Sequence, residues 1–172
     1  QYLKEPQRRI YHPDYPQHSI TLRKLLSHTT SIGIPPNLTN MYYRADDTAL
    51  DESLADFSFK QINPNTSHWL HAPPGRVASY SNEGSALAAL VVERVMNMSY
   101  IEYVGEKIIR PLGLDTTRIG VRIADFADRQ ALVKHYAYAY NASALSDWKR
   151  MIPQLDITQD PSSMWLHIPH FS

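Results

Sequence analysis

The chain has 172 residues, of which 43% are hydrophobic and 20% charged, and it contains no cysteine. This composition is typical of a globular protein with one buried core, and it excludes a disulfide framework, thiol catalysis and cysteine-ligated zinc. Basic and acidic residues balance at 17 each, and no basic run or apolar run of membrane-spanning length occurs, so no nucleic-acid partner and no membrane span are predicted.

The first predicted helix spans residues 22–28 and follows an irregular lead-in. Its three leucines fall on one helical face, and Thr21 precedes it as the predicted N-cap. A weaker helical pattern occupies residues 46–60, after a loop rich in glycine and proline. The apolar positions that define the two faces are Leu22, Leu25, Leu26, Leu50, Leu54 and Phe57.

The clearest helical pattern begins at Glu83, and Asn82 before it is well suited to be the N-cap. A second helix follows directly, because Ser99 and Glu102 have the spacing of a capping box and Pro111 ends the pattern. The apolar stripes of these two helices comprise Leu87, Leu90, Val91, Val95, Met98, Ile101, Val104, Ile108 and Ile109.

Beyond residue 118 the patterns become mixed. The alternation in "HYAYAY", residues 135–140, predicts a short strand, and its tyrosines are interpreted as packing residues rather than a ligand platform, as are Tyr42 and Tyr43. The last 25 residues contain three prolines and no clear helix, and the chain starts at Gln1, so we expect a piece of a longer protein. The predicted class is mainly α with short strands.

Four of the seven asparagines begin an Asn-x-Ser/Thr sequon, where about one is expected by chance. They are Asn37, Asn65, Asn97 and Asn141. This excess favours a glycoprotein of the secretory pathway or the extracellular space, and the alternative is that such pairs are simply common in loops.

The segment "YSN", residues 80–82, holds the strongest candidate functional residues, Tyr80 and Asn82. On its own the pattern is weak, because Asn82 is also explained as a helix cap. Its neighbours change the interpretation. Three stretches occur in a characteristic order and spacing: "LLSHTTSI" at 25–32, "PPGRVASYSN" at 73–82 and "PLG" at 111–113. This arrangement resembles the serine beta-lactamase and penicillin-binding protein superfamily, in particular its class C-like serine hydrolases and esterases.

The resemblance covers most of residues 20–118 and implies a partial α+β beta-lactamase-like fold, with residues 1–172 as an incomplete domain corresponding to much of the helical lobe. It implies that Tyr80 takes part in proton transfer to and from a serine nucleophile, and that Asn82 binds the substrate and a catalytic lysine. A free tyrosine has a pKa near 10, so this role requires a nearby cation. The implied substrate is a small molecule or peptide with an amide, lactam or ester bond, and no cofactor is implied.

Two family motifs are missing from the chain. No serine before Tyr80 begins the Ser-x-x-Lys nucleophile motif, and no Lys-Thr-Gly or His-x-Gly triplet follows Tyr80. "SDWK", from Ser146 to Lys149, fits the first pattern but comes after the tyrosine, and is interpreted as a chance match. Two hypotheses remain: a fragment of a serine hydrolase that is inactive alone, or a non-catalytic homologue that acts as a binding or scaffolding module.

Two histidine pairs have a spacing that could bridge a metal on a helix: His68 with His71, and His167 with His170. Both lie among prolines without a nearby acidic ligand, so they are interpreted as surface loop histidines and no metal site is predicted. No glycine-rich phosphate-binding loop occurs.

Overall fold

The structure is a computed structural model. It describes residues 2–34, 52–120, 126, 128, 132–133, 135–151 and 165–168. The chain divides into two compact units, which are described separately below. The first unit comprises Gln1–Asn37 and Glu52–Leu112, and the second comprises Leu38–Asp51 and Gly113–Ser172. Within the described residues, no helix combines the length and hydropathy needed to cross a membrane.

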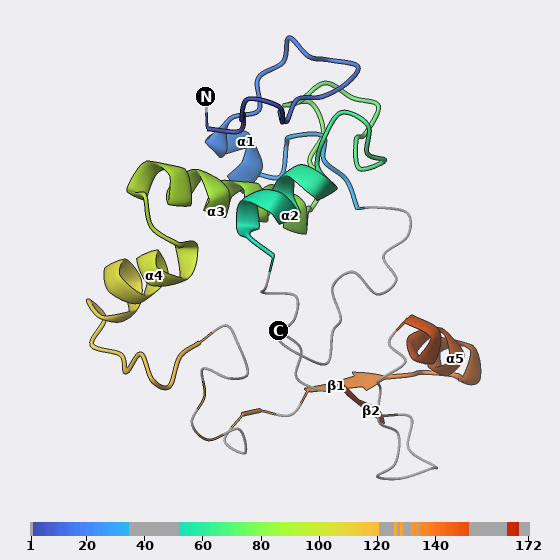
Figure 1. The fold of residues 1–172 in the computed structure, drawn as a ribbon. Helices are drawn as coiled ribbons and strands as arrows, with labels where there is room; N and C mark the ends of the chain where they lie inside the picture. Colours follow the sequence, from blue (N-terminus) through green and yellow to red (C-terminus); the bar gives the residue numbers. More distant parts are fainter. Residues whose placement is uncertain are drawn as a thin grey trace. The chain divides into compact units, whose positions relative to one another are not determined.

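The first unit is built from short helices around one long helix (Figure 1). In chain order these are α1 (Leu22–Leu26), α2 (Leu54–Gln61), α3 (Asn82–Met96), α4 (Tyr100–Val104) and the π-helical turn η2 (Gly105–Ile109). The central helix α3 packs against α1 and α2, and α4 follows it after a short turn. The unit is therefore organised around α3.

Side-chain caps begin α1, α2 and α4. The Thr21 hydroxyl accepts from the backbone N–H of Lys24 at the start of α1, as predicted. The capping box of Ser99 and Glu102 is also confirmed, because each side chain accepts from the backbone N–H of the other. Ser53 caps α2, which begins at Leu54, and residues 46–51 of the weaker predicted helix lie outside the described residues.

The core of the first unit gathers side chains from the N-terminal segment, the loop after α1, and helices α1, α2 and α3. Its buried members are Ile10, Leu25, Ile32, Phe59, Ile62, Leu87, Ala88 and Leu90. Several predicted core positions are exposed instead. Of the three leucines in α1 only Leu25 is buried, and Val95, near the end of α3, is 57% exposed. Periodicity identified the helices, but neighbouring elements decide which part of each apolar stripe is covered.

The second unit contains a two-stranded antiparallel sheet and a helix. Strand β1 (His135–Tyr138) pairs with β2 (Trp165–Ile168), and Tyr136 lies opposite His167. The strand predicted in "HYAYAY" is thus confirmed over His135–Tyr138, whereas residues 139 and 140 lie outside it. The tyrosines at 136, 138 and 140 are 44% to 74% exposed and do not fill a core in the described part. Helix α5 (Ala142–Met151) was not predicted; the Asn141 side chain accepts from the N–H of Ala144 in its first turn.

Candidate functional site

The three residues of the "YSN" segment point in alternating directions. Ser81 has an extended backbone, with φ −149° and ψ 121°, and extended backbone sends successive side chains to opposite sides. The Ser81 side chain is buried, with 1% of the residue exposed, whereas Tyr80 is 62% exposed and Asn82 is also exposed. The segment therefore presents the phenol and the amide to the surface while its middle residue anchors it.

The anchor is a helix cap, and this corrects the prediction for Asn82. The hydroxyl of Ser81, not the side chain of Asn82, caps α3, by accepting from the N–H of Gly84 at 3.1 Å. The same hydroxyl donates to the carboxyl of Glu83 at 2.9 Å. Asn82 is the first residue of α3, so its amide is not used for capping.

A second segment, residues 28–33, lies beside residues 68–79, which lead to Tyr80. Backbone hydrogen bonds join the two segments. Two residues of the 28–33 segment, His28 and Ser31, have left-handed backbone conformations, with φ of 54° and 61°. The bonds lead from Ser79 N–H to His28 O (2.8 Å), Gly75 N–H to Thr29 O (2.6 Å), Leu70 N–H to Ser31 O (2.9 Å), and Gly33 N–H to His68 O (2.7 Å).

His28 is a residue at this site that sequence reasoning missed. Its ring lies 4.7 Å from the ring of Tyr80, centroid to centroid, with a tilt of 46° between the planes. Its Nδ1 accepts the N–H of Ser81 at 3.3 Å. The signal was present in the sequence, because His28 lies in "LLSHTTSI", one of the three stretches that carry the family resemblance.

Behind the segment lies a buried pair, His68 and Glu83. They are 6% and 3% exposed, and His68 Nε2 is 3.8 Å from Glu83 Oε1. Burial raises the pKa of the Glu83 carboxyl and lowers the pKa of the His68 imidazole, because the interior disfavours the charged form of each. The interpretation of His68 as a surface histidine is wrong, because His68 is buried beside Glu83 of α3. His71, beside Asp14, is exposed.

The described residues contain no group of three or more metal-binding side chains. His68 is buried and His71 is exposed. His167 is in β2, and His170, Tyr42 and Tyr43 lie outside the described residues.

The "SDWK" match lies on α5, on a helix rather than in a loop. Ser146 and Lys149 are one turn apart and both exposed, and the ion pair in this turn joins the next residues, Asp147 and Arg150, at 2.9 Å. In the described part of the second unit, no hydrogen bond joins Ser146 to Lys149. Among the residues that the structure describes, the pattern is thus present on a helix without the buried surroundings that activate a serine.

Three of the four sequon asparagines, Asn65, Asn97 and Asn141, are exposed, and Asn37 lies outside the described residues. Asn97 has a left-handed backbone with φ of 51° at the end of α3. Exposure is what a glycosylated asparagine requires, and glycosylation itself stays a prediction.

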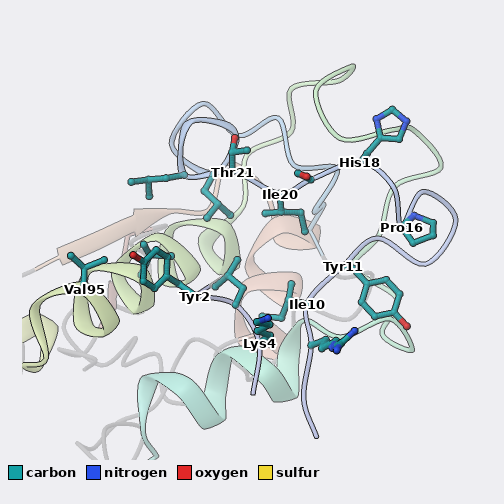
Figure 2. Close-up of a pocket in the computed structure, with 15 residues that line it drawn as sticks. Tyr2, Lys4, Ile10, Tyr11, Pro16, His18, Ile20, Thr21 and Val95 are labelled. Carbon is teal, nitrogen blue, oxygen red and sulfur yellow. The ribbon is translucent and has the colours of Figure 1, made fainter. Parts of the chain in front are cut away.

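A separate hollow of about 820 Å³ lies between the N-terminal segment, α1 and the end of α3 (Figure 2). Tyr2 and Val95 line one end of it, and Tyr11, Pro16 and His18 line the other. Neither Tyr80 nor Asn82 lines this hollow, so the exposed "YSN" surface and the hollow are different features of the first unit.

Three comparisons with known proteins identify the family of the chain and its relatives. A family model named Beta-lactamase matches residues 2–154. Penicillin-binding protein 4* of Bacillus subtilis (strain 168) is 28% identical over 131 residues, which cover 74% of this chain and 26% of that protein. The chain thus spans about a quarter of the length of this relative.

Among solved structures, D-amino acid amidase from Ochrobactrum anthropi SV3 is similar in two complexes. The complex with D-phenylalanine has a TM-score of 0.47 and 20% identity, and covers 88% of this chain and 38% of the amidase chain. The complex with L-phenylalanine amide has a TM-score of 0.44 and 21% identity, and covers 80% of this chain and 38% of the amidase chain.

Proposed function

The chain belongs to the beta-lactamase family, and we propose that it is part of a longer serine hydrolase to whose active site it supplies Tyr80 and Asn82. In the proposed reaction a serine hydroxyl attacks the carbonyl carbon of an amide, lactam or ester. The leaving group departs with a proton, and water then hydrolyses the acyl-serine ester. Residues 1–172 would correspond to much of the helical lobe of an α+β fold.

The observation that carries this proposal is the outward presentation of Tyr80 and Asn82 by one anchored segment. Ser81 between them is buried and provides the cap of α3, so both neighbours are exposed without leaving the helix uncapped. A catalytic group must be accessible and yet held in place by the scaffold, and this arrangement meets both requirements.

Each exposed side chain has a chemical role in the proposal. As the phenolate, which the lysine ammonium of the proposed site would favour, Tyr80 can accept the proton of the attacking serine; as the resulting phenol it can give that proton to the leaving group. The amide of Asn82 has both an acceptor and two donors, so it can bind a substrate carbonyl and a lysine ammonium at once. These roles follow from the family resemblance, matched to these two positions alone.

The nucleophile is proposed to lie outside these 172 residues. The absence of Ser-x-x-Lys before Tyr80, and the 26% share of the relative that the chain spans, both support this. The missing motif equally supports a non-catalytic homologue that binds or scaffolds. The flanking sequence discriminates between these two hypotheses. The hydrolase is favoured if Ser-x-x-Lys lies upstream and Lys-Thr-Gly or His-x-Gly lies downstream. The binding module is favoured if the flanks are present but those residues are replaced.

The experiment is covalent labelling with a fluorophosphonate and a fluorescent penicillin. The longer protein is expected to be labelled at its Ser-x-x-Lys serine, and Tyr80→Phe is expected to slow labelling about 100-fold, the size of a general acid–base contribution. Tyr100→Phe, which changes an exposed tyrosine of α4, is the matched control and should label at the normal rate.

The 172-residue chain alone is expected to remain unlabelled, because no serine before Tyr80 begins a Ser-x-x-Lys motif and Ser146 is exposed. Labelling of this chain at Ser146, mapped by peptide mass spectrometry, would show that "SDWK" is a working nucleophile. A longer protein with both motifs that neither probe labels would contradict the hydrolase proposal.

A further inference from the structure

We propose that His28 is the positioning residue of the candidate site, and that it holds the phenol of Tyr80 in its reactive orientation. The inference rests on the proposed function, in which Tyr80 transfers the proton. His28 lies two residues after the end of α1 and more than fifty residues before Tyr80 in the chain. It contacts the segment of residues 79–81 in three ways.

The three contacts come from three different parts of His28. Its backbone carbonyl accepts the N–H of Ser79 at 2.8 Å, and its Nδ1 accepts the N–H of Ser81 at 3.3 Å. Tyr80 lies between these two residues in the chain, and its ring centroid is 4.7 Å from that of the His28 ring. One residue thus contacts the residue before Tyr80, the residue after it, and its side chain.

The acceptor role of Nδ1 determines the form of the imidazole. A ring nitrogen that accepts a backbone N–H carries no proton, so the proton of the neutral ring is on Nε2. His28 thereby satisfies the N–H of Ser81, whose hydroxyl and carbonyl are already used in the first turn of α3. The imidazole links the tyrosine to the capped end of the helix.

The backbone of His28 is also adapted to this position. Its φ of 54° lies in the left-handed region, which non-glycine residues adopt infrequently and which is retained where the surroundings determine it. This conformation is found in the same residue whose carbonyl and ring contact the "YSN" segment. Asparagine and glycine tolerate the left-handed region best, so both can replace histidine here without adding backbone strain.

Tyr80 needs such a neighbour because it is exposed. A side chain that is 62% exposed has little packing of its own to select one rotamer, yet proton transfer requires its phenol oxygen to be held within a fraction of an ångström. The ring of His28 covers part of the tyrosine and restricts it. His28 is not assigned contact with the reacting atoms, so it acts through Tyr80.

Two substitutions separate the contacts of His28. In His28→Asn, the amide oxygen can occupy the place of Nδ1 and accept from Ser81, but the ring that contacts Tyr80 is lost. In His28→Gly, both the acceptor and the ring are lost while the backbone conformation is retained. His71→Asn is the matched control, because it removes a histidine ring whose side chain is 96% exposed.

The first readout uses the 172-residue chain and needs no activity. By NMR, the ring protons of Tyr80 are expected to lose their ring-current shift in both His28 variants. Hydrogen exchange at the Ser81 amide is expected to accelerate about three- to tenfold in His28→Gly, the value of one hydrogen bond, and to stay near wild type in His28→Asn. Unchanged Tyr80 signals in both variants would overturn the proposal.

The second readout uses the longer serine-containing protein. With KM changed less than about twofold, kcat is expected to fall about tenfold in His28→Asn and about 100-fold in His28→Gly, as for a misplaced catalytic group. A wild-type kcat in His28→Asn, or a change confined to KM, would overturn the proposal. If the longer protein is not labelled by either probe, the proposed function fails, and the NMR readout still decides whether His28 orders Tyr80.

Discussion

Two short motifs of this chain invite comparison: "YSN" at the start of α3, and "SDWK" within α5. Both match a pattern of the beta-lactamase family, and both begin or lie on a helix. In the first, a buried serine caps the helix, and a histidine contacts the exposed tyrosine. In the second, Ser146 and Lys149 are both exposed, and the hydrogen bond in that turn joins other residues.

The difference shows that a catalytic sequence pattern depends on the surrounding residues that hold its side chains in place. Ser81 is connected to Glu83, Gly84 and His28, so a change to it affects the whole segment. Ser146 has no comparable support in the described part of the second unit. The predictions below compare substitutions in the two regions, and each is tested by the free energy of unfolding.

The largest difference in the free energy of unfolding is expected when a leucine is shortened in the helix that carries each motif. Leu87→Ala in α3 removes a side chain that is 0% exposed, and should lower the free energy of unfolding by about 2–5 kcal/mol. Leu145→Ala in α5 shortens a half-buried side chain and should cost about 1 kcal/mol or less. Urea unfolding of both variants measures the difference. Equal losses would mean that the helices are equally well packed.

The next comparison exchanges the two serines. Ser81→Ala removes the cap of α3 and the donor to Glu83, and should cost about 1–2 kcal/mol. Ser146→Ala should change the free energy of unfolding by less than about 0.5 kcal/mol, as is usual on an exposed face. Chemical denaturation of the pair tests this. A neutral Ser81→Ala would show that the cap does not anchor the segment.

The buried Glu83 in α3 predicts a pH dependence of the free energy of unfolding. Its folded pKa is raised above the ordinary value of 4.5, so in the window above pH 4.5 the folded state binds the proton more tightly. The contribution of Glu83 to stability is therefore full below pH 4.5 and is lost as the pH rises through the folded pKa. In Glu83→Gln this decline should be absent, as measured by urea midpoints across the pH range. Glu106→Gln, at an exposed carboxylate of η2, should retain the decline.

His68 contributes with the opposite sign. Burial lowers its folded pKa below the ordinary value of 6.5, so between the two values the unfolded state binds the extra proton. Stability from this group is therefore present above pH 6.5 and is lost as the pH falls through the window. His68→Leu should remove that loss on acidification, and His71→Leu, at an exposed histidine, should leave it unchanged. If the loss on acidification persisted in His68→Leu and disappeared in His71→Leu, it would be assigned to His71 and not to His68.

The smallest effect is expected at Asn82. Because Ser81 provides the cap, Asn82→Ala should alter the free energy of unfolding by less than about 0.5 kcal/mol, whereas loss of a true N-cap typically costs about 1 kcal/mol. Thermal denaturation beside Ser81→Ala measures this. A larger loss in Asn82→Ala than in Ser81→Ala would restore Asn82 as the cap and weaken its assignment to substrate binding.

The sequence by itself determined the elements whose signals are local. The cap at Thr21, the capping box of Ser99 and Glu102, and the alternation of β1 depend on side chains within a few residues of one another, and all three are present in the structure. The family was identified from three motifs whose order and spacing along the chain are also properties of the sequence. Local hydrogen bonds and side-chain periodicity need no knowledge of the rest of the fold.

The tertiary structure alone decided which side chains face inward and which residues meet. Ser81 rather than Asn82 caps α3, because the extended backbone at Ser81 turns its hydroxyl inward and its neighbours outward. His68 is buried beside Glu83, and His28 contacts Tyr80, because the segment of residues 28–33 pairs with residues 68–79. These contacts join positions far apart in the chain, and no local pattern of residue types specifies them.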